Sequence, residues 1–384
     1  MQTRTEAPNR TWQLQQLQEV LVAAYQHPIY RTAWEQQGYS GARIATSGLG
    51  DVPGTPYTPE LGIRFSLPTS RREQTALQKQ LLPLLLGPSH TRFTQLSIAL
   101  FHGIDPYKTG ATLTHLLQGR RRITRTYHPG ADRAALVHQL NEQQPTLLIG
   151  YPSVIERLAQ EQIAGRLSIV PKRVIVFEEP ASNRTLRLSE AAWSVPTHYL
   201  LQCGSLPIAF SEEQTPDQLI PLQNCTISER TTNEFIPVAE TAIGRLVVTS
   251  LLHLERPIVR LATNLLIREQ ELGTWQLPLG QPHEVLWFQT FAGGNTYLDP
   301  VSLGDIDAPG LKQFQYVRHG IRSLTMRAEF SGSPDATFPK IHKRIEVLLA
   351  ERQLTGAVDF RIEPVEELPP DPNTGIFHRI LHAS

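Results

Sequence analysis

The chain has 384 residues, which is long enough for two domains with a substantial buried core. Lys plus Arg and Asp plus Glu each number 36, so the net charge is zero and no basic excess points to nucleic acid. No apolar run approaches the roughly 20 residues that span a bilayer. The polar N-terminus lacks the apolar core of a signal peptide. The chain has two cysteines, Cys203 and Cys225, which provide no disulfide framework. We therefore expect a cytoplasmic protein with neither a nucleic-acid nor a membrane partner.

The first 180 residues alternate between helical and strand patterns. Apolar residues at helical spacing predict helices at 11–37 with a break at Pro28, and at 71–86, 109–118, 132–144 and 153–165. Short apolar runs predict strands at 96–101, 121–127, 146–151 and 173–180, and a segment rich in Gly and Pro at 41–64 predicts loop and edge strand. This alternation favours a parallel sheet covered by helices.

The pattern changes near residue 195. Strand-like runs follow at 197–203, 235–241, 244–252 and 257–261. A smaller unit then reads as a strand at 284–291, a helix at 302–313, strands at 314–320 and 322–330, a helix at 338–354, a strand at 357–368 and a Pro-rich tail. We predict an α/β fold, with a large domain at 1–272 whose β-rich part covers about 195–268, and a small α+β C-terminal domain at 273–384.

Five segments resemble the adenylate-forming superfamily, and specifically phenylacetate–CoA ligases and deazaflavin-coenzyme adenylylating synthetases. They are LSIALFHG, PTLLIGYPSVIERLAQEQ, RVIVFEEPASNRTLRLSEAAW, GRLVVTSLLHLERPIVR and the tail ELPPDPNTGIFHRIL. Each motif is weak alone, but together they cover roughly residues 95–384 in the family's order. The resemblance implies a carboxylate that attacks the α-phosphate of ATP, with Mg²⁺ and a cation that offset the growing charge.

The resemblance implies a Gly/Ser/Thr-rich loop around the phosphates. The candidate is TSGLGD at 46–51, in which Thr46, Ser47, Gly48 and Gly50 would bind the nucleotide. A plain surface turn is the alternative interpretation, because Leu and Asp are poor neighbours for phosphate. The segment at 67–73 has no glycine and is a weaker candidate.

The family's next motif is an aromatic residue followed by Thr–Glu, whose Glu holds Mg²⁺. One register matches Tyr199 to the aromatic and puts Gln202 and Cys203 at Thr–Glu, and another puts Gly204 and Ser205 there. The magnesium carboxylate is missing in both registers. Cys203 is a candidate nucleophile, but a structural Cys is the alternative because no partner base is visible.

The family's strand arginine corresponds to Arg260, whose alternative role is a structural ion pair with Glu255 or Glu240. The ribose-binding Asp falls at Leu265, and the lysine that reaches the adenylate from the C-terminal domain falls at Ile376. The family's hinge corresponds to Gly280, Gln281 and Glu284.

Two further places invite a functional interpretation. His102 follows the strand at 96–101, where the family builds its acyl pocket, and is a candidate general base or a pocket-lining side chain. Glu178, Glu179 and Pro180 end a predicted buried strand in the loop that frames adenine in the family, although solvated carboxylates are the alternative. The 13 histidines show no metal-like spacing, so no metal site is predicted.

We therefore expect an atypical adenylate-forming-like enzyme that activates or transfers a carboxylate or acyl group, with CoA or an acyl carrier protein as candidate acceptors. The resemblance implies ATP and Mg²⁺ as cofactors, whereas the missing charged groups argue against them. An enzyme on the same scaffold that has abandoned ATP, acting by acyl transfer, cyclisation or hydrolysis, and a non-catalytic protein remain open alternatives.

Overall fold

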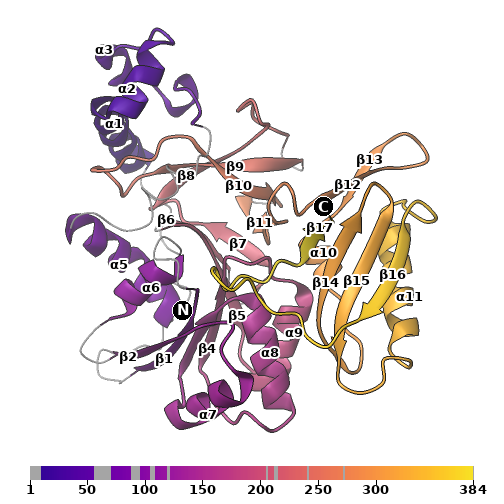
Figure 1. The fold of residues 1–384 in the computed structure, drawn as a ribbon. Coiled ribbons are helices and arrows are strands. Elements are labelled where there is room, and N and C mark those ends of the chain that lie inside the picture. Colours follow the sequence, from indigo (N-terminus) through magenta and orange to yellow (C-terminus); the bar gives the residue numbers. More distant parts are fainter. Residues whose placement is uncertain are drawn as a thin grey trace. The chain divides into compact units, whose positions relative to one another are not determined.

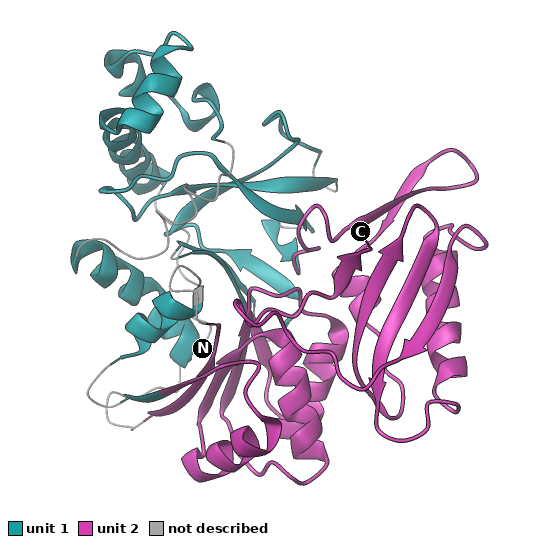
Figure 2. Cartoon of the chain, viewed as in Figure 1, with its two compact units in different colours: residues 1–95, 105–124, 200–276 teal, residues 96–104, 125–199, 277–384 magenta. Residues whose placement is uncertain are grey.

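The structure is a computed structural model that describes residues 10–55, 71–87, 96–103, 109–118, 122–204, 206–211, 215–239, 242–270 and 273–383. The chain forms two compact units, each built from three stretches of sequence (Figure 2). Unit 1 comprises residues 1–95, 105–124 and 200–276, and unit 2 comprises residues 96–104, 125–199 and 277–384. The predicted division after residue 272 into a large and a small domain stays a prediction. None of the described helices is long and apolar enough to cross a membrane.

The largest sheet is mixed and has eight strands, in the order β11-β7-β6-β5-β4-β3-β1-β2 (Figure 1). Its strands are β1 (Leu96–Phe101), β2 (Arg122–Tyr127), β3 (Leu147–Gly150), β4 (Arg173–Phe177), β5 (Thr197–Cys203), β6 (Leu206–Ser211), β7 (Gln218–Pro221) and β11 (Trp275–Gln276). β1, β3 and β4 run parallel, whereas β5, β6, β7 and β11 form antiparallel pairs. The predicted α/β class is confirmed, but the sheet, which the alternation of helices and strands predicts to be parallel, is mixed.

The parallel strands belong to unit 2 and are linked by helices α7 (Arg133–Gln143), α8 (Pro152–Ile163) and α9 (Asn183–Trp193). β3 is buried along its whole length, because a parallel strand covered on both faces has no solvent side. The helix ends follow local chemistry: Asp132 caps α7 through the N–H of Ala135, and Pro152 starts α8. The strands predicted from buried apolar runs therefore lie close to their expected positions.

Unit 1 contains helices α1 (Arg10–Gln26), α2 (Pro28–Glu35), α3 (Gly41–Ile44), α5 (Arg71–Leu86) and α6 (Thr109–Leu117), and the 3₁₀ turn η1 (Leu49–Asp51). Its own sheet has three antiparallel strands in the order β10-β9-β8, with β8 (Thr226–Thr231), β9 (Ile243–Ser250) and β10 (Leu261–Arg268). Apolar side chains of α1 share a core with Val52, Leu251 and Val259. The break predicted at Pro28 separates α1 from α2 as expected.

Two strand predictions in unit 1 are wrong. Residues 235–239 of the expected strand at 235–241 form no regular strand: Phe235 has a φ of 61°, and Pro237 makes one isolated bridge to Thr231. Proline has no N–H for a ladder, so the segment cannot pair regularly; residues 240 and 241 lie outside the described part. The expected strand at 257–261 begins only at Leu261, because Arg260 takes a left-handed φ of 43°.

The C-terminal part of unit 2 has a two-stranded sheet of β12 (Leu286–Gln289) and β13 (Asn295–Leu298), and a four-stranded sheet in the order β16-β15-β14-β17. The four strands are β14 (Leu311–His319), β15 (Ser323–Phe330), β16 (Asp359–Pro364) and β17 (Ile380–His382), and the helices are α10 (Pro300–Gly304) and α11 (Phe338–Glu351). The helix predicted at 302–313 is wrong beyond Gly304. Pro309 and Gly310, with a φ of 79° at Gly310, form a turn that leads directly into β14.

Candidate functional site

Polar side chains gather in unit 2 at the carboxyl ends of three parallel strands. His102 follows β1, Tyr151 follows β3, and Glu178 and Glu179 follow β4. Ligands of α/β folds bind at this edge of a parallel sheet, because the loops there converge. The structure thus brings two predicted site residues, His102 and Glu179, to the same sheet edge.

A tight turn at the end of β4 sets the position of Glu179. Glu178 has a φ of 64°, and the N–H of Glu179 donates to the carbonyl of Phe177 over 2.8 Å. A three-residue turn with positive φ at a non-glycine residue is rare and strained. Such strain persists only where the surroundings hold it, and it turns the Glu179 side chain into the protein.

The Glu179 carboxyl is 4% exposed and accepts three hydrogen bonds. Oε1 accepts from the N–H of Phe377 over 2.6 Å and from the hydroxyl of Ser153 over 3.0 Å, and Oε2 accepts from the N–H of Ser153 over 3.0 Å. Burial raises the pKa of Glu179 to about 7, although the hydrogen bonds from Phe377 and Ser153 oppose this rise. A carboxyl with this pKa can both accept and donate a proton near neutral pH.

A turn from the C-terminal tail covers this edge. Asp371 Oδ1 accepts from the N–H groups of Asn373 and Thr374, at 3.0 and 2.7 Å, and the carbonyl of Thr374 accepts from Tyr151 Oη at 3.3 Å. A Cβ built on Gly103 would lie 1.9 Å from the Thr374 carbonyl oxygen. Only glycine at position 103 therefore lets the tail lie this close to the end of β1.

The other predicted residues of unit 2 lie beside this group. The Tyr199 hydroxyl donates to the carbonyl of Glu179 over 3.0 Å, and burial raises the pKa of Tyr199. Pro180 is half-buried and directly follows Glu179. The ring Nδ1 of His102 lies 2.6 Å from the carbonyl of Gly103. His102, Glu179, Pro180 and Tyr199 therefore belong to one region of unit 2.

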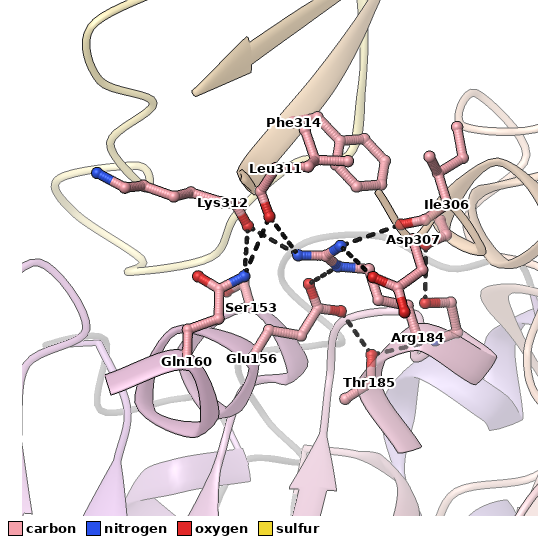
Figure 3. Close-up of polar contacts among 12 residues, drawn as sticks. Ser153, Glu156, Gln160, Arg184, Thr185, Ile306, Asp307, Leu311, Lys312 and Phe314 are labelled. Atoms are coloured by element: carbon pink, nitrogen blue, oxygen red, sulfur yellow. Dashed lines mark hydrogen bonds and ion pairs between the residues drawn. The ribbon is translucent and has the colours of Figure 1, made fainter. Parts of the chain in front are cut away.

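A buried ion-pair network joins α8 and α9 to the C-terminal segment of the same unit (Figure 3). The Arg184 side chain is 1% exposed, and its Nε lies 3.3 Å from Glu156 Oε2. Its terminal nitrogens donate to the carbonyls of Ile306, Leu311 and Lys312 at 2.9 to 3.2 Å. Arg379 Nη2 lies 3.5 Å from the other Glu156 oxygen, which also accepts from Thr185 over 2.7 Å. The single carboxylate of Glu156 thus anchors the chain just beyond Phe377.

The predicted phosphate loop lies in unit 1 at the end of α3. The hydroxyls of Thr46 and Ser47 donate to the carbonyl of Arg43 over 3.1 and 2.8 Å, and the N–H of Gly48 donates to the Asp51 carboxylate over 2.8 Å. Gly50 lies within the short turn η1, Leu49–Asp51. Local partners therefore engage the groups that would cradle a phosphate. The weaker candidate at 67–73 lies largely outside the described residues.

Arg260 has a carboxylate partner inside unit 1. Its Nε donates to Glu229 Oε2 over 3.0 Å, and Nη1 donates to the carbonyl of Val52 over 2.6 Å. The backbone N–H of Arg260 donates to Thr249 Oγ1 over 2.9 Å, which holds the left-handed turn before β10. The structural ion pair considered from the sequence is present, but its partner is Glu229.

The residues around Cys203 end β5. Cys203 is a half-buried thiol outside any disulfide, and it lies opposite Leu206. Gln202 is 8% exposed, and its amide has no hydrogen-bond partner among the described residues. A buried amide without a hydrogen-bond partner destabilises the folded protein. Gln202 is therefore a candidate ligand contact, which the sequence alone does not single out. Ser205, which the second register placed in the motif, lies outside the described residues.

The positions matched to the family's ribose-binding Asp and hinge make hydrogen bonds to neighbouring protein groups. The N–H of Leu265 donates to Thr263 Oγ1, and Glu284 Oε2 accepts from the N–H of Gln281 over 2.9 Å. The hydrogen bond with Glu284 raises the pKa of His378. Within the described part of the chain, no group of three or more His, Cys, Asp or Glu side chains is arranged to hold a metal ion.

Comparisons with known proteins identify the fold. No protein-family model matches the chain, and no curated protein matches it significantly in sequence. The structure is similar to 2-hydroxyisobutyryl-CoA ligase in the postadenylation state with R3-HIB-AMP, at a TM-score of 0.71, with 18% identity over 99% of this chain and 91% of that one.

Two further solved structures are similar over a smaller share of their own length. For anthranilate CoA ligase AuaEII with anthranoyl-AMP the TM-score is 0.59, with 14% identity over 77% of this chain and 60% of that one. For the amide bond synthetase McbA from Marinactinospora thermotolerans the TM-score is 0.56, with 12% identity over 79% of this chain and 64% of that one. The chain therefore has the fold of the adenylate-forming enzymes, which acyl-CoA ligases and an amide synthetase share.

Proposed function

We propose that this protein is an atypical adenylate-forming-like enzyme that transfers an acyl group at the carboxyl edge of β1, β3 and β4. The observation that carries the proposal is Glu179, a fully buried carboxyl with a pKa of about 7 at the edge where this fold class binds ligands. A carboxyl held only for stability would be expected to have a cationic partner at hydrogen-bond distance, whereas Glu179 is held by Ser153 and a backbone N–H.

Glu179 can carry the proton that acyl transfer needs. In its ionised form it takes the proton of an attacking hydroxyl, amine or water as that group adds to the acyl carbonyl. In its neutral form it returns the proton to the departing thiolate of a thioester, so the proton balance closes over one cycle. The substrate class is an acyl thioester of CoA or of an acyl carrier protein, and the 374–377 turn moves aside to expose the carboxyl.

The residues expected to bind ATP do not fit a triphosphate. Arg260 is neutralised by Glu229, and the hydroxyls of Thr46 and Ser47 donate to a neighbouring carbonyl. The position of the family's catalytic lysine holds Ile376. We therefore include no step through ATP or Mg²⁺ in the proposed reaction.

A second candidate function is an ATP-dependent carboxylate ligase with substitute phosphate-binding groups. The similarity to a CoA ligase that holds an acyl-AMP, over nearly the whole chain, favours this candidate. It requires that ATP binding rearranges the Arg260–Glu229 pair, or that residues elsewhere supply the positive charge.

One experiment separates the two functions. The purified protein is incubated with a panel of acyl-CoA thioesters without ATP, and with the matching carboxylates, CoA and Mg·ATP, and the products are followed by mass spectrometry. We expect thioester consumption without ATP and a loss of at least about 100-fold in Glu179→Gln, while the exposed control Glu190→Gln keeps the wild-type rate. Pyrophosphate release that depends on a carboxylate would support the second candidate, and full activity of Glu179→Gln would exclude the proposed role.

A further inference from the structure

Unit 2 contains a small cavity between helices α7 and α8 (Figure 1). Its volume is about 20 Å³, which is the space of roughly one or two water molecules. Most of its walls are apolar, with Leu136 and Val137 from α7 and Val154 and Leu158 from α8. A group that binds here must therefore be small, and it must tolerate apolar neighbours on several sides.

Arg157, on α8, brings an accessible positive charge to this cavity. The residue is half-buried, and its guanidinium makes neither a hydrogen bond nor an ion pair with any residue that the structure describes. None of its side-chain nitrogens is fully buried, so a ligand can reach them. Burial lowers the pKa of Arg157, and the charge of nearby Arg133 adds to this effect. Arginine nevertheless stays protonated at neutral pH, so the cavity keeps its cation.

The carboxylates around the cavity do not neutralise Arg157. Glu161 also lines the cavity, but its carboxylate accepts from Arg166 Nη2 over 3.1 Å and lies 3.9 Å from Arg133. Three further carboxylates attract Arg157 from a distance without forming an ion pair with it, namely those of Glu179, Glu329 and Glu367. The guanidinium of Arg157 therefore still has its hydrogen-bond donors available for an anion.

We propose that this cavity binds the carboxylate group of a short-chain carboxylic acid, with Arg157 as its main partner and Arg133 as a second cation. A guanidinium can donate two parallel hydrogen bonds to a planar carboxylate, whose size suits the cavity. The alkyl chain of the acid lies against the apolar side chains of α7 and α8. A phosphate would give up most of its hydration to the same apolar walls, so the carboxylate is the favoured anion. This site does not rest on the proposed acyl transfer at Glu179.

Binding is tested with the whole chain by saturation-transfer NMR at constant ionic strength. The probes are acetate and propionate, with propionamide as the uncharged match for propionate. We expect propionate to bind the wild type, propionamide not to bind, and Arg157→Met to lose at least about tenfold in affinity for propionate. The control is Arg361→Met in the same unit, whose side chain is 72% exposed and which should keep the wild-type affinity. Absence of binding by both acids, equal binding by propionamide, or unchanged affinity in Arg157→Met would overturn the proposal.

Chemical modification of arginine tests the same site in the wild type, and it applies even if Arg157→Met does not fold. Phenylglyoxal reacts with accessible guanidinium groups, and mass spectrometry of peptides gives the rate at each arginine. At ten times its Kd, propionate should slow the modification of Arg157 about tenfold, because only the free site reacts. The exposed Arg361 should react at an unchanged rate. Equal rates at Arg157 with and without propionate would also overturn the proposal.

Discussion

Replacing Arg184 by methionine should release the C-terminal segment of unit 2 from helices α8 and α9. The substitution keeps most of the side-chain length but removes the positive charge that faces Glu156 in a site that is 1% exposed. Breaking a buried ion pair by removing one partner typically costs about 3–5 kcal/mol, because the other charge stays buried.

The surroundings of Arg184 place the expected loss near the middle of this range. Glu156 keeps Arg379 at 3.5 Å and Thr185 at 2.7 Å, which lowers the cost of losing Arg184. The carbonyls of Ile306 and Lys312 lose their guanidinium donor, which raises the free-energy cost of the substitution. We therefore expect a loss of about 4 kcal/mol.

Hydrogen exchange read by mass spectrometry resolves this effect by segment. A loss of about 4 kcal/mol corresponds to a nearly 1,000-fold fall in protection of peptides that cover residues 306–316 and 374–380, if these segments open as one unit. The matched control is Arg187→Met on the same helix, whose ion pair with Asp305 at 2.8 Å is half exposed on the arginine side. A surface pair of this kind contributes at most about 1 kcal/mol. Equal effects of the two variants would refute the role assigned to the buried network.

Three further substitutions test other parts of the structure. Folding raises the pKa of Glu179 from 4.5 to about 7, so the protonated carboxyl favours the folded state below pH 4.5. This contribution of about 3 kcal/mol is lost as the pH rises to 7. Urea titrations at several pH values should show the loss in the wild type and not in Glu179→Gln, and parallel stability curves of the two proteins would contradict it. Gly103→Ala should raise the exchange rate of residues 374–377, because its Cβ would meet the Thr374 carbonyl, whereas Gly50→Ala, with no atom within 4 Å, should not. Arg260→Met should lower the urea midpoint by leaving Glu229 unpaired, and an unchanged midpoint would show that the pair contributes no stability.

The sequence predicted best where local patterns decide the structure. The buried apolar runs at 96–101 and 146–151 became β1 and β3, because such runs suit the interior of a parallel sheet. The helix predicted at 302–313 failed because Pro309 and Gly310 form a turn, and turn chemistry there outweighs apolar periodicity.

The partners of the site residues could not be predicted, because they come from distant parts of the sequence. The N–H of Phe377 reaches Glu179 across 198 residues, and Glu229 lies 31 residues from Arg260. Closeness along the chain instead favours Glu240 and Glu255 as partners of Arg260. Only the fold decides which carboxylate lies beside a guanidinium.

A calorimetric titration of Mg·ATP into the purified protein tests most directly whether the expected nucleotide groups are occupied by protein partners. Because protein groups already engage Arg260, Thr46 and Ser47, we predict no binding at millimolar ATP. Micromolar binding would contradict it, and would show that the adenylate-forming fold of this chain still holds a nucleotide through groups other than those described.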